Sequence, residues 1–117
     1  MFLTGTAALM MLVSGAPSDV GYEPLLDGHD AIAVEVIEAN TELAADDPAK
    51  LINLGIAYAR QGRTEEARAK FEAAMRGSDR VVLETAEGEW KESRHLARLA
   101  LQMLDRGEFR AEQMAAR

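Results

Sequence analysis

An alternation of small and bulky residues in the middle of the chain limits its fold more than any other feature. Gly55 and Ala67 are small, whereas Tyr58 and Phe71 are large, and the spacings within each half are those of one face of a helix. Small residues let two helices approach closely, and the large ones fill the space beside them. Gly62 lies between the two halves, where a helix can end in the left-handed conformation that favours glycine. The pattern predicts two antiparallel helices joined by a tight turn.

The order of these residues resembles the tetratricopeptide repeat, a 34-residue helix–turn–helix unit. The matching positions are Pro48, Leu51, Leu54, Gly55, Tyr58, Gly62, Ala67, Phe71 and Ala74. Leu51 stands where the family favours Trp, and Asp79 where it favours Pro. The resemblance implies an all-α fold in which antiparallel helix–turn–helix repeats stack into a short right-handed solenoid. It also implies a concave groove, lined by the first helix of each repeat, that binds a protein or peptide.

About two and a half repeats are expected over residues 22–117, with a full repeat at 48–81 and a truncated one at 22–47. Gly28, Ala33 and Ile37 precede Gly62, Ala67 and Phe71 by 34 residues. Asp30–Ala44 is therefore the second helix of the truncated repeat. Its expected buried stripe consists of Ile32, Ala33, Val36 and Leu43. The first helix falls on Val20–Asp27 and is shortened by Pro24.

The next repeat is displaced, because the turn at Gly107 follows Gly62 by 45 residues rather than 34. The additional residues fit best in Val81–Glu92, which is rich in strand formers and contains Gly88. We expect a small β-hairpin turning near Glu87–Gly88, the alternative being an irregular loop with a buried Trp90. Residues 93–117 then form a partial repeat, in which Ser93 caps a helix over Arg94–Asp105 and Glu108–Ala116 forms a final frayed helix.

The first residues of the chain resemble a secretory signal. Phe2–Val13 is apolar or small and uncharged, and Ser14–Pro17 is a small-residue segment that a signal peptidase accepts. No basic residue precedes the apolar run, which is too short to span a bilayer. We expect residues 1–21 to be a signal-like segment cleaved after Gly15, and the mature domain to be periplasmic or secreted. The alternative is a buried N-terminal helix of the mature fold.

Composition excludes several kinds of chemistry. The chain has no cysteine and two histidines, and its formal net charge of −7 argues against a nucleic-acid surface. Sequence motifs of hydrolases, metalloproteases and phosphate-binding loops are absent. Adjacent carboxylates such as Asp46–Asp47 provide too few ligands for a metal. We therefore expect no enzymatic activity, no cofactor and no metal.

The groove expected from the resemblance carries a mixed polar and apolar strip. Ile52, Asn53, Ile56 and Arg60 are the residues of the first helix that the packing pattern does not use. Some tetratricopeptide domains hold a peptide's C-terminal carboxylate with Lys, Asn and Arg side chains. Asn53 matches the middle Asn of that clamp, and Arg94 and Arg98 match its last cationic pair; its first Lys and Asn have no counterpart here. The expected partner groove therefore consists of Ile52, Asn53, Ile56, Arg60, Arg94 and Arg98.

The sequence thus predicts a non-catalytic adaptor that binds a protein or peptide partner, such as an acidic C-terminus, in its groove. The alternative is a structural protein that assembles with itself. Residues 19–47 carry nine acidic side chains and no basic one, whereas residues 94–117 carry five basic and three acidic ones. Opposite charge at the two ends would favour head-to-tail association.

Overall fold

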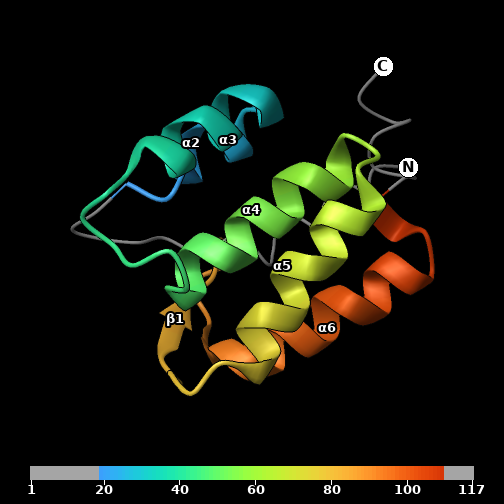
Figure 1. Cartoon of the computed structure of the whole chain (residues 1–117). Coiled ribbons are helices and arrows are strands. Elements are labelled where there is room, and N and C mark those ends of the chain that lie inside the picture. The colour runs from blue at the N-terminus through green and yellow to red at the C-terminus, as the bar shows by residue number, and fades with distance from the viewer. Residues whose placement is uncertain (1–18, 110–117) are drawn as a thin grey trace.

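The computed structural model describes residues 19–109 and shows a helical protein with one small sheet (Figure 1). Its elements are α2 (Tyr22–Leu26), α3 (Asp30–Ala39), α4 (Pro48–Arg60), α5 (Thr64–Arg76), β1 (Val82–Glu84), β2 (Trp90–Glu92) and α6 (Ser93–Asp105). Helix α4 is central: it packs against α3, α5 and α6, and α5 also packs against α6. The expected mostly helical fold and inserted hairpin are confirmed.

Local signals fix both ends of α4. The carboxylate of Asp47 accepts a hydrogen bond from the backbone N–H of Lys50 at 3.1 Å, and Pro48 occupies the first turn, where its missing N–H costs nothing. Gly62, with φ of 80°, makes the turn into α5. The turn predicted between the two helices is therefore confirmed.

The α4–α5 pair is held by the contact that the small and bulky residues predicted. A Cβ added at Gly55 would lie 2.6 Å from Cδ1 of Phe71, so the ring packs directly on the α4 backbone. Phe71 and Ala67 are fully buried. Phe71 also stacks on Phe109, with ring centroids 6.0 Å apart, which joins this pair to the segment after α6.

The helix expected over Asp30–Ala44 ends earlier, at Ala39. The Asn40 side chain accepts a hydrogen bond from the N–H of Glu42 at 2.8 Å and donates one to the carbonyl of Asp19 at 2.7 Å. This local turn competes with the helix and ends it. The expected buried stripe is also corrected, since Ala33, Val34 and Ile37 are buried whereas Ile32 is 50% exposed.

The hairpin pairs Val82 with Glu92 and Glu84 with Trp90, and Gly88 turns it with φ of 82°. Trp90 is 65% exposed, so the alternative of a loop with a buried Trp is wrong. The prediction that Ser93 caps this helix is wrong, because α6 already includes Ser93 and no side chain caps its start. The Ser93 hydroxyl instead accepts a hydrogen bond from the N–H of Val81 at 3.2 Å. This bond ties the start of α6 to the hairpin.

Two expectations lie mostly outside residues 19–109: residues 1–18 of the expected signal-like segment 1–21, with its cleavage site, and residues 110–116 of the final helix expected over Glu108–Ala116. None of the helices within residues 19–109 has the length and apolar character needed to cross a membrane.

Candidate functional site

The α4 strip expected to line an open groove is buried. Ile52, Asn53 and Ile56 are each 0% exposed, and Arg60 is 7% exposed. The prediction that these four residues form an exposed strip is therefore wrong. Every residue of α4 is buried, because the helix has neighbours on more than one side.

The polar residues of that strip bind the N-terminal part of the same chain. Nδ2 of Asn53 donates a hydrogen bond to the carbonyl of Val20 at 2.9 Å, and Nη2 of Arg60 donates one to the carbonyl of Leu25 at 3.0 Å. The guanidinium of Arg60 also lies 3.2 Å from the Asp30 carboxylate. Buried polar groups need such partners, so these side chains stabilise the fold.

A third donor on α4, Lys50, behaves in the same way. Its Nζ donates to the carbonyl of Asn40 at 2.9 Å, and the lysine is only 7% exposed. Lys50, Asn53 and Arg60 therefore recognise three main-chain carbonyls between residues 20 and 40. Sequence reasoning missed this role because helical spacing separates faces but does not tell which face another segment covers.

Two ionisable groups at this junction have altered pKa values. Burial raises the pKa of Asp30, and the nearby Arg60 guanidinium opposes that rise. Burial, followed by a 2.8 Å hydrogen bond from its hydroxyl to Glu38, raises the pKa of Tyr58 to about 12. The guanidinium of Arg63 lies 4.5 Å from the centre of the Tyr58 ring. These are structural contacts between α3, α4 and the start of α5.

The two remaining groove candidates lie on α6. Nη2 of Arg94 donates to the carbonyl of Gly77, the residue after α5, at 2.9 Å, and Arg94 is half-buried. Arg98 is exposed. Of the six residues expected to form the groove, only Arg98 is open to solvent, so they do not form one accessible clamp.

The outward face of the hairpin exposes two large apolar side chains. Trp90 is 65% exposed and Val82 60%, and strand alternation places both on the same face. Leu83, on the opposite face, packs against the core. An exposed apolar patch is a candidate interaction site, and this face carries the two most exposed large apolar side chains of residues 19–109. Sequence reasoning found the hairpin but not which face is exposed; the alternation of Val82, Leu83 and Glu84 was the available signal.

A shallow open hollow of about 340 Å³ lies between the α4–α5 turn and the end of α6. It is lined by Ala59, Gly62, Thr64, Leu104, Asp105, Arg106, Gly107 and Phe109. Its charged groups have partners, since Arg68 pairs with Asp105 at 3.0 Å and Glu108 lies 3.7 Å from Arg106. Within residues 19–109, no cluster of His, Asp or Glu side chains is placed to hold a metal ion.

Comparison with known proteins gives a family match for the central helix pair, α4 and α5. Residues 48–76 match the tetratricopeptide repeat family. The match covers α4 and α5 and supports the family resemblance of this segment, and such repeats generally mediate protein–protein interactions without catalysis. No curated protein and no solved structure matches the chain. The tetratricopeptide unit is thus the part of the molecule that a known family accounts for.

Proposed function

We propose that the chain is a non-catalytic protein-binding module and that the outward face of its hairpin contacts the partner. The observation that carries this proposal is the exposure of Trp90 and Val82 on one face of the sheet. Burying an exposed aromatic side chain is a large source of binding energy. A partner that covers these side chains removes their apolar surface from water, which favours the complex.

The tetratricopeptide unit has a supporting role in this proposal. Helix α4 uses Lys50, Asn53 and Arg60 to hold the chain's own N-terminal segment, so a partner reaches these side chains only by displacing that segment. The hairpin needs no such rearrangement. It follows α5 and leads directly into α6, and β2 packs against α6.

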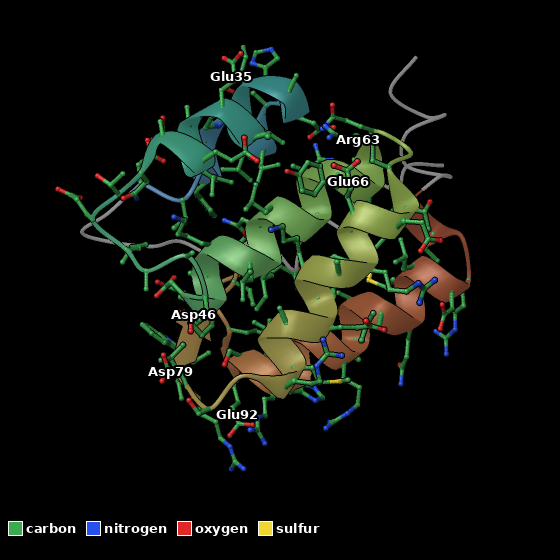
Figure 2. All side chains as sticks on the ribbon, in the orientation of Figure 1. Glu35, Asp46, Arg63, Glu66, Asp79 and Glu92 are labelled. Carbon is green, nitrogen blue, oxygen red and sulfur yellow. The ribbon has the colours of Figure 1, made fainter. Side chains whose placement is uncertain are left out.

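Site-specific photo-cross-linking in the native host tests this function. A photoreactive phenylalanine analogue is placed at position 90, and a control is placed at Glu35, an exposed residue of α3 that Figure 2 shows at the opposite end of the molecule from Glu92. The apolar run at residues 2–13 favours export, so exported fractions are analysed first. We expect a discrete adduct with another protein from position 90 and none from position 35.

Two results would contradict the proposal. Absence of any adduct at position 90, or the same adducts from both positions, would show that the hairpin face is not a specific contact. An adduct between two copies of the chain would replace the separate partner with self-assembly. Sedimentation of the purified protein would then show association at increasing concentration.

A further inference from the structure

We infer that the partner segment bound by the hairpin is basic and extended, an inference that rests on the proposed function and specifies its chemistry. The occupant is a stretch of another protein in which Arg or Lys alternates with apolar residues. The charge of the hairpin, the position of its Trp and its open strand edge each support this class of partner.

The outward face of the hairpin is acidic as well as apolar. The register places Glu92 opposite Val82 and Glu84 opposite Trp90, so two carboxylates accompany the two apolar side chains. The hairpin's one basic residue, Lys91, lies on the other face and pairs with Glu89 at 3.5 Å. The four side chains of the outward face therefore include no cation, and their charge is complementary to a basic segment.

Trp90 and Glu84 together favour a cationic side chain. Directly opposed residues in a non-hydrogen-bonded antiparallel pair have Cβ atoms about 4.5–5.5 Å apart, so one guanidinium can stack on the indole and reach the carboxylate. Indole is the aromatic ring that attracts cations most strongly. An anionic partner would meet repulsion at both ends of the same face.

The edge of β1 favours an extended partner. The N–H of Thr85 donates to the carbonyl of Glu89 at 2.8 Å, across the hairpin. Alternation along the strand therefore directs the main-chain groups of Val82 and Glu84 away from β2. Within residues 19–109, these groups bond to no other segment. An extended segment can pair with this edge while its side chains cross the outward face.

Fluorescence of the full chain tests this inference, because Trp90 is its one tryptophan and reports only on this face. The protein is titrated with a blocked hexapeptide of alternating Arg and Val, and separately with one of alternating Glu and Val. We expect the basic peptide to change the Trp90 emission saturably and the acidic peptide to leave it unchanged. Binding weakens by about fivefold when salt rises from low to high concentration, since exposed charges are screened.

A charge-matched pair of variants shows where the peptide binds. The double variant Glu84→Gln and Glu92→Gln removes two carboxylates from the outward face and should weaken binding by about fivefold. The control, Glu35→Gln and Glu65→Gln, removes two exposed carboxylates elsewhere and changes the net charge equally. Its affinity should stay within about twofold of the unmodified chain, since it leaves the pairing groups on this face in place.

Four results would overturn the inference. Equal binding of the acidic peptide, or equal weakening in both double variants, would show that the glutamates do not select the partner. A Trp90 emission that changes with protein concentration alone would identify a second copy as the occupant. Cross-linking of a partner at position 90 with no response to the basic peptide would refute the basic chemistry and leave the proposed function intact.

Discussion

The tetratricopeptide unit and the hairpin use their side chains in opposite ways. In α4 every residue is buried, and even its Lys, Asn and Arg side chains are bound to carbonyls of the same chain. In the hairpin, one face packs on the core and the other exposes Trp90 and Val82. The segment that resembles a binding family is thus used for stability, whereas the inserted segment leaves Trp90 and Val82 exposed.

Substitution of Gly55 tests the close packing of the two tetratricopeptide helices. Gly55→Ala places a methyl group against the Phe71 ring, and we expect a loss of about 2–4 kcal/mol in the free energy of unfolding, despite alanine's better helix propensity. Urea unfolding followed by circular dichroism measures it. Adding Phe71→Leu makes room for the methyl group, so the two changes together should cost less than the sum of each alone. Strict additivity would contradict the packing described here.

Asn53 tests whether the predicted groove residue is structural. Asn53→Ala leaves the buried carbonyl of Val20 without this donor, and we expect a loss of about 2 kcal/mol in the free energy of unfolding. The control is Gln102→Ala on the exposed side of α6. This variant should change the free energy of unfolding by less than about 0.5 kcal/mol. Equal stability of the two variants would contradict the structural role of the Asn53 side chain.

The hydroxyl of Tyr58 gives a pH-dependent test of the α3–α4 junction. In a Tyr22→Phe background, absorbance titration should give a pKa of about 12 for Tyr58. Glu38→Gln should lower this pKa without restoring the ordinary value, because burial is its largest cause. Because the pKa of Tyr58 is higher in the folded chain than its unfolded value of 10.0, the protonated hydroxyl stabilises the fold fully below pH 10. This stabilisation is lost as the pH rises through about 12. An ordinary pKa for Tyr58 would contradict its burial.

Trp90 should have the smallest effect on stability. Trp90→Ala removes a side chain that is 65% exposed, and we expect a change of less than about 0.5 kcal/mol in the free energy of unfolding. The matched change in the buried unit, Phe71→Ala, should cost about 3–5 kcal/mol. Similar losses in both variants, measured by urea unfolding, would show that the Trp90 side chain belongs to the core.

Much of the fold could be predicted from the sequence because its signals are local. The Gly55–Phe71 spacing, the left-handed turn at Gly62 and the strand formers before Gly88 each act over a few residues. The early end of α3 also has a local cause, the turn at Asn40. The sequence-based prediction extended the helix past this turn because Leu43 continues the apolar spacing.

The candidate site was harder to predict, because accessibility depends on contacts between distant segments. Asn53 reaches Val20, 33 residues away, and Arg60 reaches Leu25, 35 residues away. Helical spacing identified both as lying on one face of α4, but it carried no information on what covers that face. For the hairpin, pairing of Glu84 with Trp90 fixes the outward face, and that pairing is itself a tertiary result.

The most direct test of the account is the solvent exposure of Trp90 in the free protein. Its emission maximum and its quenching by acrylamide are measured on the unmodified chain, where no other tryptophan contributes. The structure predicts emission at the position of indole in water and quenching close to that of the unfolded chain in urea. A blue-shifted emission protected from acrylamide would show that Trp90 is covered in the free protein, and the hairpin would then offer no open binding face.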